Sequence, residues 1–352
     1  GGGGGGAGIR RQPTTAPPIV NNGGGGGGGG GAMMVVADGA VRLVGNINLD
    51  GGVGSIGVQG ANSGAGGGGG GGSLVVRASG NLEIGSTAVI SAVGGLGAVQ
   101  SASATTPMSS GAGGDGLILF ETNGSLVAPG SVEDDSLNPT PLESIGSSYG
   151  ISSGPIETGT GVTDVVFTIS DSPYLINTDN GSIVTSTGVT LPVVGINGVF
   201  EFGNLVVDEN VIIEAVGSES LYLRASGFVN IAGFIDVSGE PGGFPVISSD
   251  PAVSPIPGAG GIAGPGGGAG GEGGSTVDSL TVLDGADGGI PAGVPAALIF
   301  TGVPPGGDPG SSVPADLIAA ATGADSVSGE VSVGGPCSAG GGGGGGYSVD
   351  GQ

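Results

Sequence analysis

The side chains of this sequence that could do chemistry are mainly carboxylates, and the densest group of them is Glu133, Asp134 and Asp135. Pairs of carboxylates act as general acid and base in enzymes that cleave polysaccharides. These three residues lie in a stretch rich in Ser and Pro, which indicates a solvated loop. We therefore predict that the protein is not an enzyme and has no catalytic residues.

A second acidic stretch, DSPYLINTDNG, brings Asp171, Asp179 and Asn180 close together in the chain. Carboxylate and amide oxygens are ligands that Ca²⁺ takes. The stretch lacks the full D-x-[DN]-x-[DN]-G spacing with a closing Glu, so it is a weak calcium candidate. Apart from calcium, the sequence suggests no cofactor.

Other reactive side chains are scarce. The chain of 352 residues has no His, and its five cations are all Arg, so the usual general bases and amine nucleophiles are absent. Without Lys, the glycine runs cannot complete the phosphate-binding pattern Gly-x-x-x-x-Gly-Lys. The single cysteine, Cys337, cannot form an intrachain disulfide, which leaves a cross-link to another chain, a modification or a small buried residue.

The charge of the chain is sparse and one-sided, with 30 acidic against five basic residues and a formal net charge of −25. Nucleic acids and anionic membranes are bound through clustered cations, so neither is expected as a partner. No apolar run approaches the roughly 20 residues of a membrane span, so no membrane insertion is expected. The chain begins at Gly1 without Met or a signal peptide, which we interpret as a processed product or part of a longer one.

Glycine dominates the composition, with 89 Gly and 23 Pro. Such a fraction is typical of low-complexity chains. However, the mean hydropathy is positive (+0.34), and the apolar residues form short runs of Val, Ile and Leu. Disordered chains lack such material, so the sequence predicts an ordered protein with glycine-rich parts.

Internal repeats indicate the fold. The segments LVVRASGNLEIGSTAVISAVGG (74–95) and LYLRASGFVNIAGFIDVSGEPGG (221–243) share an apolar run, Arg-Ala-Ser-Gly and two further strand-like segments. A shorter copy, MVVADGAVRLVGNINLDGG, occupies 34–52, and a partial copy, LILFETNGSLVAPG, occupies 117–130. Short strands separated by tight bends predict an all-β fold made of parallel β-helix (β-solenoid) coils. Independent hairpins in a β-sandwich are the competing interpretation.

Equivalent positions of the repeats predict which residues meet in such a stack. The apolar runs start at Met33, Leu74 and Leu117. The expected inward ladder consists of Val41, Leu82, Leu126 and Val229. On the outer face, Arg42 and Glu83 fall at matching positions, and we expect an exposed ion pair worth at most about 1 kcal/mol.

The glycine runs stand at a constant place, just before the apolar runs. Because glycine has no side chain, such runs can adopt polyproline II and hydrogen-bond sideways through their backbones. We expect the runs at 23–31, 66–72, 264–274 and 340–346 to pack in this form as layers beside the coils. Mobile loops are the alternative, because ordering glycine costs more backbone entropy than ordering any other residue.

The same patterns divide the chain into five regions. They are a glycine-rich N-terminal extension (1–32), repeats with glycine-rich insertions (33–131), a Ser/Pro/acidic boundary (132–161), a second repeat portion (162–243) and a Pro/Gly-rich C-terminal region that ends in a polyglycine–strand segment (244–352).

The repeats SLVVRASGNLEIGSTAVISAVGG and SLYLRASGFVNIAGFIDVSGEPGG resemble those of secreted bacterial β-solenoids, such as filamentous-haemagglutinin-like and autotransporter-passenger proteins. They are most similar to glycine-rich surface proteins in which polyglycine insertions alternate with coils. The resemblance implies a secreted, cell-surface protein that acts as an adhesin, fibre or scaffold.

We therefore expect a structural subunit of an extracellular bacterial fibre or sheath, a homo-oligomer or filament that assembles head-to-tail through strand stacking and polyglycine pairing. The residues expected to carry assembly are Gly23, Gly31, Gly66, Gly72, Gly340, Gly346, Tyr347 and Val349. The alternatives are a surface adhesin that binds a receptor or glycan through its loops, and a fragment of a longer protein.

Overall fold

The computed structural model describes residues 22–57, 64–100, 108–127, 131–133, 140–141, 160, 163–246, 256–274, 288–289, 312–313 and 337–338. Regular structure in this part consists of β-strands and one short 3-10 turn, η2 (Ile169–Asp171). Within the same residues, no helix has the length and apolar composition that crossing a membrane requires.

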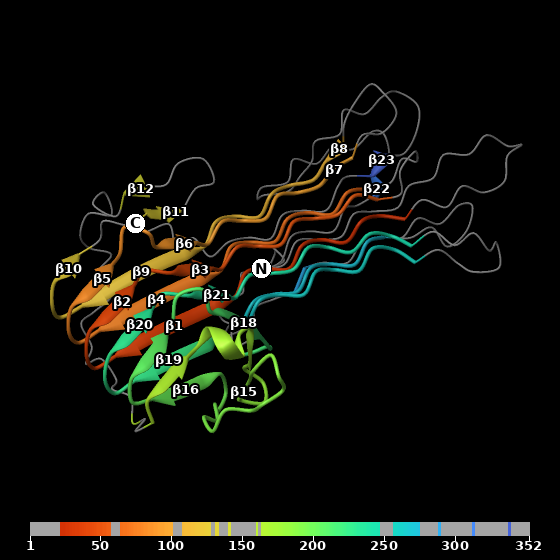
Figure 1. Ribbon diagram of the computed structural model, residues 1–352. Helices are drawn as coiled ribbons and strands as arrows, with labels where there is room; N and C mark the ends of the chain where they lie inside the picture. Colours follow the sequence, from red (N-terminus) through yellow and green to blue (C-terminus); the bar gives the residue numbers. More distant parts are fainter. Residues whose placement is uncertain are drawn as a thin grey trace, which may run out of the picture.

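Three sheets contain most of the strands (Figure 1). The first sheet has the order β16 (Val199–Phe202), β19 (Leu221–Ala225), β1 (Ala32–Ala37), β4 (Ser73–Ala78) and β9 (Leu117–Thr122). The second has the order β10 (Leu126–Val127), β5 (Leu82–Ile84), β2 (Val41–Leu43), β20 (Val229–Ile231), β17 (Leu205–Val207) and β13 (Val165–Phe167).

The third sheet has the order β12 (Thr140–Pro141), β11 (Ser131–Glu133), β6 (Val89–Ser91), β3 (Asn46–Asn48), β21 (Phe234–Asp236), β18 (Ile212–Val216), β14 (Tyr174–Asn177) and β15 (Ser182–Val184). All neighbours in the three sheets pair in parallel except β11 with β12 and β14 with β15. Two small antiparallel pairs lie outside these sheets, β7 (Val99–Gln100) with β8 (Met108–Ser109) and β22 (Ser312–Val313) with β23 (Cys337–Ser338).

Consecutive strands go to successive sheets, so that three strands in a row form one unit. The units are β1–β2–β3, β4–β5–β6, β9–β10–β11, β16–β17–β18 and β19–β20–β21. The all-β fold with parallel strands is therefore confirmed, and a sandwich of independent hairpins does not fit the parallel pairing.

The order of the units in space differs from their order in the chain. The β19 unit pairs with the β1 unit, so that Met33 lies opposite Leu221. The β4 unit lies on the other side of the β1 unit, and the β9 unit follows it. The first unit of the chain is thus in the middle of the stack, and both repeat-containing portions of the sequence contribute to all three sheets.

Strand alternation places the apolar side chains between the sheets. In β4, Leu74, Val76 and Ala78 are buried, while Val75 and Arg77 face outward. The expected inward ladder is confirmed, because Val41 lies opposite Leu82 and Val229, and Leu82 lies opposite Leu126. Because Leu126 belongs to the last unit at its end of the stack, its side chain is 48% exposed.

The pairing of β9 is offset by one residue from the starts of the apolar runs. Leu74 lies opposite Ile118, and Leu117 lies opposite Ser73 and faces outward with 43% exposure. The run LILF is apolar at every position, so its sequence cannot indicate which face is inward. A shift of one residue moves every side chain to the other face of a strand.

Each arginine in the described part forms an ion pair with a glutamate on the neighbouring strand. The nitrogen–oxygen distances are 3.3 Å for Arg42–Glu83, 2.6 Å for Arg77–Glu121 and 3.3 Å for Arg224–Glu201. The expected Arg42–Glu83 pair is confirmed, and its side chains are about half exposed. Such pairs contribute roughly 1 kcal/mol or less each and help to fix register.

The two ends of the stack differ. Beyond the β16 unit, the segment 163–198 covers the core, with Ile183 and Val193 buried. Phe167 and Tyr174 meet edge to face at a centroid distance of 4.8 Å in this cap. At the opposite end, the inward residue Leu126 is exposed. Among the described residues, the end of the stack at the β9 unit is therefore the less covered of the two.

Candidate functional site

The glycine runs are not linkers between domains but extended segments that leave the sheets and return to them. The chain runs away from the third strand of a unit and comes back to the first strand of another unit. Figure 1 shows these segments side by side, extending away from the sheets. We call them the glycine bundle, which comprises 23–31, 49–55, 64–72, 92–98, 110–116, 237–243, 258–264 and 268–274.

The segment 23–31 forms a hydrogen-bonded centre of the bundle. All nine of its amides donate to backbone carbonyls, at nitrogen–oxygen distances of 2.7 to 3.1 Å. The nine amides point to three neighbouring segments in turn. Residues 23, 26 and 29 donate to the carbonyls of 274, 271 and 268, and residues 24, 27 and 30 donate to those of 64, 67 and 70. Residues 25, 28 and 31 donate to the carbonyls of 243, 240 and 237. Every third amide thus points to the same neighbour, which is the three-residue repeat of polyproline II.

Glycine is required here by close approach of the backbones. A Cβ atom on Gly27 would lie 1.9 Å from the carbonyl oxygen of Gly52, and one on Gly28 would lie 2.1 Å from that of Ile262. All residues of 23–31 and 64–72 are buried, although they have almost no side chains. The bundle is therefore a second core, packed from backbone atoms instead of apolar side chains.

The bundle continues on both sides of this centre. Residues 66, 69 and 72 donate to the carbonyls of 55, 52 and 49, whereas residues 68 and 71 donate to those of 111 and 114. The expected run at 264–274 begins with a turn at Pro265 and Gly266, which reverses the chain, so that 268–274 runs antiparallel to 258–264. Gly266 has φ +73°, a conformation that glycine adopts without strain.

All segments of the bundle have one end in common, far from the sheets, which we call the tip. Its hydrogen bonds join Gly23 to Gly274 and Gly258, Gly24 to Gly64, Gly25 to Gly243, Gly66 to Ser55 and Ala98, and Ser110 to Ala98. The described residues on either side of 58–63, 101–107 and 247–255 belong to segments that meet at the tip. At about 3.1 Å per residue, nine residues hold the tip roughly 28 Å from the sheets.

Two serines that the sequence analysis did not single out connect segments at the tip. The hydroxyl of Ser55 donates to the carbonyl oxygen of Gly243 at 2.5 Å, and the side chain is buried. The hydroxyl of Ser110 donates to the carbonyl of Gly66. A serine directly next to glycine in a glycine-rich stretch is the signal that could have identified both.

Two aspartates hold the other end of the bundle, where it joins the sheets. Asp50 Oδ1 accepts hydrogen bonds from the Ser91 hydroxyl and, at 2.8 Å, from the Val93 amide. Asp115 Oδ1 accepts from the Gly94 amide at 2.9 Å. These carboxylates are part of the structural framework and bind backbone amides.

The calcium candidates lie near the cap of the stack. Asp171 is in η2 and accepts a weak hydrogen bond from the Thr168 hydroxyl, and Asn180 Oδ1 accepts one from the Ser182 amide at 3.0 Å. Asp179 Oδ1 accepts from both the hydroxyl and the amide of Ser218, each at 2.7 Å. In the described part of the chain, no three acidic, Cys or His side chains are grouped closely enough to share a metal ion.

The other expected site residues lie mostly outside the described part. Glu133 is in β11, and Asp134 and Asp135 are outside the described residues. The same holds for the C-terminal group expected to carry assembly, which comprises Gly340, Gly346, Tyr347 and Val349. Gly23, Gly31, Gly66 and Gly72 lie within the glycine bundle, where they pair with other segments of the same chain.

The Ser218 hydroxyl is expected to control the ionisation of Asp179. Its hydrogen bond is the main reason why the pKa of Asp179 is lowered, and the Ser218 amide adds to the effect. The folded pKa of Asp179 lies below the ordinary value. The ionised carboxylate therefore stabilises the fold at pH values above its unfolded pKa, and this stabilisation is lost as the pH falls through the folded pKa. We expect Ser218→Ala to raise the pKa of Asp179, measured by NMR titration of its carboxyl carbon.

The matched control for this prediction is Ser170→Ala, whose hydroxyl contacts Thr168 and not Asp179. This control should leave the pKa of Asp179 unchanged. An unchanged pKa in Ser218→Ala would show that the hydroxyl has no influence on the carboxylate.

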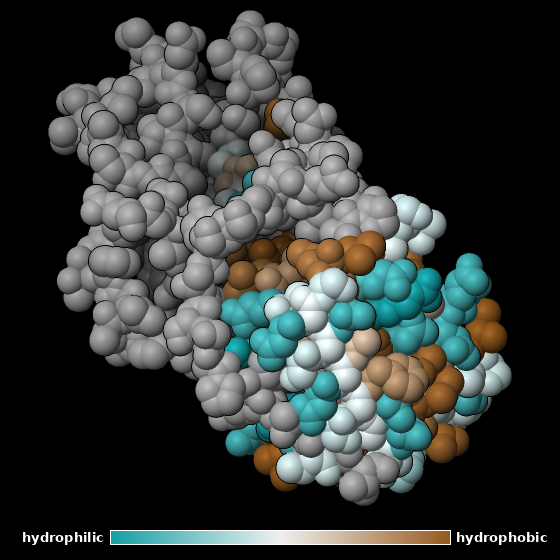
Figure 2. Space-filling model, turned by 90° about the vertical axis from the view of Figure 1, so that its left-hand side faces the viewer, coloured by the Kyte–Doolittle hydropathy of each residue, from teal (hydrophilic) through white to brown (hydrophobic). Residues whose placement is uncertain are grey.

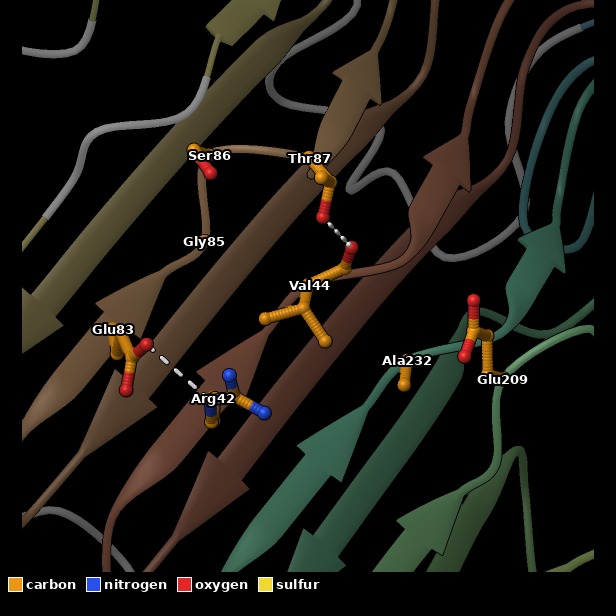
Figure 3. A pocket seen from close by; sticks show the side chains of 8 residues that line it. All are labelled: Arg42, Val44, Glu83, Gly85, Ser86, Thr87, Glu209 and Ala232. Atoms are coloured by element: carbon orange, nitrogen blue, oxygen red, sulfur yellow. Dashed lines mark hydrogen bonds and ion pairs between the residues drawn. The ribbon is translucent and has the colours of Figure 1, made fainter.

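A shallow depression of about 500 Å³ lies on the outer side of the stack, along the second sheet and the bends that lead from it to the third sheet (Figure 3). Its lining consists of Arg42, Val44, Glu83, Gly85, Ser86, Thr87, Glu209 and Ala232. Arg42 is paired with Glu83, and the Thr87 hydroxyl donates to the Val44 carbonyl at 3.0 Å. Most polar groups that could bind a ligand here are already engaged with the protein.

The surface formed by the bends between the first and second sheets is mainly polar. Figure 2 shows this face, where teal and white residues cover most of the coloured surface and hydrophobic residues form separate groups. Side chains at the bends bond to the next unit, as Asn81 Oδ1 accepts from the Ser125 amide at 3.1 Å.

Comparison of the chain with protein-family models, with curated proteins and with solved structures gave no match. The function is therefore argued from the geometry of the bundle and the stack alone.

Proposed function

We propose that this chain is a structural β-solenoid protein whose glycine bundle presents binding segments at its tip to a receptor or glycan outside the cell. The three-strand units are the coils of the solenoid, and the bundle segments are polyproline II helices inserted between them. The parallel pairing and the three-residue hydrogen-bond repeat support this assignment.

The observation that carries the proposal is the convergence of separate bundle segments at one tip. The described segments that flank the intervals 58–63, 101–107 and 247–255 are joined there by backbone hydrogen bonds. Loops supported by a rigid framework are a common arrangement for recognition. The buried, hydrogen-bonded bundle supplies the rigid framework, since all nine amides of its central segment are engaged.

A fibre subunit is the second candidate. It is favoured by Leu126, an inward residue that is exposed at the β9 end of the described part of the stack. Against it, the amides of 23–31 donate within the chain, so this run has no free donors for pairing with another chain. The cap over the β16 unit also covers the surface that head-to-tail stacking would use.

The test replaces 58–63 and 101–107 by Gly-Ser linkers of the same lengths. Binding of the labelled protein to printed glycans and to intact cells should fall at least roughly tenfold, while the unfolding midpoint stays unchanged. Replacing 186–189 in the cap in the same way is the control and should preserve binding. Equal binding by both variants would contradict the proposal, and regular filaments of the purified protein in electron micrographs would favour the fibre.

A further inference from the structure

Three segments of the glycine bundle form a layer that we call the outer layer: 49–55, 92–98 and 237–243. They continue the strands β3, β6 and β21, which are neighbours in the third sheet, and they lie side by side in the same order (Figure 1). Residues 51 and 54 donate to the carbonyls of 93 and 96, and residues 239 and 242 donate to those of 50 and 53. The register of the sheet is therefore kept in the outer layer.

The three-residue repeat decides which side chains of the outer layer point out of the bundle. A Cβ atom on Gly54 would lie 1.9 Å from a carbonyl oxygen of the segment 64–72, and one on Gly52 would lie 2.0 Å from a carbonyl oxygen of 237–243. Two of every three positions thus face neighbouring backbone. The third position faces outward, where Val53 is 44% exposed and Leu96 of the next segment is 66% exposed.

The outward positions of the three segments form a regular array. The hydrogen-bonded register sets them side by side in rows, and successive rows are three residues, about 9 Å, apart. The row nearest the sheets is mixed and contains Asp50 and Ser238. The two rows nearer the tip are entirely apolar, and we call them the apolar patch; its members are Leu96, Val53, Pro241, Val99, Ile56 and Phe244.

The fold itself does not require apolar residues in the patch. Its side chains point away from the buried bundle, and Phe244, the largest of them, is 69% exposed. A polar side chain would fit at each of these positions equally well. The chain has 30 carboxylates, yet those close to the patch, Asp50 and Glu240, lie at its margin. An exposed apolar area with charges only at the rim is typical of a contact surface.

Charge and area indicate which partner fits the apolar patch. A basic partner would require carboxylates at the centre of the patch, and a net charge of −25 repels acidic partners. A second copy of the chain offers a surface of the same shape and without central charge. The six side chains expose on the order of 500 Å² per copy, so two copies would bury on the order of 1,000 Å², the lower limit of a specific interface.

We propose that the apolar patch docks on the apolar patch of a second copy in a two-fold symmetric dimer. Leu96, Val99 and Phe244 form the centre of the contact, and Asp50 and Glu240 lie at the rim, where water reaches their carboxylates. The hydrogen-bonded backbone of the outer layer is rigid before contact, so docking orders few further groups. The dimer carries two tips, which raises avidity for a multivalent receptor; this consequence alone rests on the proposed function.

Analytical ultracentrifugation of the full-length chain tests the dimer without any ligand, so its failure is distinct from a failure of receptor binding. We expect a reversible dimer with a Kd of roughly 10–100 μM, because the contact area is small. Raising the NaCl concentration should strengthen the dimer, since salt screens the repulsion between two acidic copies. A chain that remains monomeric at millimolar concentration, or a dimer that weakens with salt, would overturn the inference.

Substitutions in the array identify the surface that makes the contact. Leu96→Asp with Val53→Asp should weaken the dimer at least roughly tenfold, and Leu96→Ser with Val53→Ser should weaken it without added charge. The matched control is Val194→Asp in the cap, where the side chain is 72% exposed and lies outside the bundle. An unchanged unfolding midpoint of the dilute monomer shows that the variants fold. Equal weakening by the cap control would place the contact elsewhere and refute the proposal.

Discussion

Replacing Gly27 by Ala is expected to destabilise the protein by roughly 3 kcal/mol or more, measured by urea unfolding. Glycine-to-alanine changes usually stabilise by about 0.4–1 kcal/mol where the backbone conformation allows them, because they restrict the unfolded chain. At Gly27 the added Cβ would lie 1.9 Å from the carbonyl oxygen of Gly52 and 2.4 Å from its carbonyl carbon. Both atoms belong to backbone, so neither segment can move away without breaking its hydrogen bonds.

The control for Gly27→Ala is Gly188→Ala in the cap. Gly188 has φ +82°, and a Cβ atom there would meet nothing within 4 Å. This substitution therefore carries only the backbone strain of a positive φ, about 1–2 kcal/mol. If Gly27→Ala is no more destabilising than Gly188→Ala, the close contact between Gly27 and Gly52 is absent in solution.

Phe200→Ala is expected to cost about 3–5 kcal/mol, because it removes a large buried side chain and leaves a cavity. Phe200 is fully buried in β16, in the unit beneath the cap. Gly195 of the cap approaches the Phe200 ring so closely that a Cβ atom there would lie 2.6 Å from it. The substitution should therefore loosen the contact between the cap and the stack as well as the core.

Glu201→Ala is the matched control for Phe200→Ala, one position along the same strand on the opposite face. Glu201 pairs with Arg224 at 3.3 Å on the outer surface, so its loss should cost about 1 kcal/mol or less. Thermal unfolding of both variants measures the difference. Equal losses of stability would contradict the inward orientation of Phe200.

The sequence was sufficient to predict local structure where polar and apolar residues alternate. Val41 is followed by Arg42, and Leu82 is followed by Glu83. Side chains on a strand point alternately to its two faces, so the inward orientation of Val41 and Leu82 and the Arg42–Glu83 pair could be predicted. The face on which Leu117 lies could not be read from the sequence, because its run is apolar throughout. The turn at Gly266 was missed although the dipeptide Pro265-Gly266 is a turn signal, because the run was interpreted from its glycine content alone.

The order of the units could not have been predicted from the repeats. Repeats that bury similar inward rows can stack in several orders, and consecutive copies are the simplest expectation. The observed contact of the β1 unit with the β19 unit depends on pairing between strands far apart in the sequence. Likewise, the glycine runs were expected to pack in layers, but their individual partners depend on that same order.

The central place of the first unit affects how the protein forms during synthesis. Asn48 of β3 contacts Asp236 of β21, a residue 188 positions later in the chain. At about 5–20 residues per second, a nascent chain needs on the order of 10–40 s to make that stretch. During this time one side of the first unit has no native neighbour, and the high contact order makes the closing step slow. Arg42, whose side chain is about half exposed, lies on β2 at this edge, and a charge at an unpaired edge disfavours pairing with another chain.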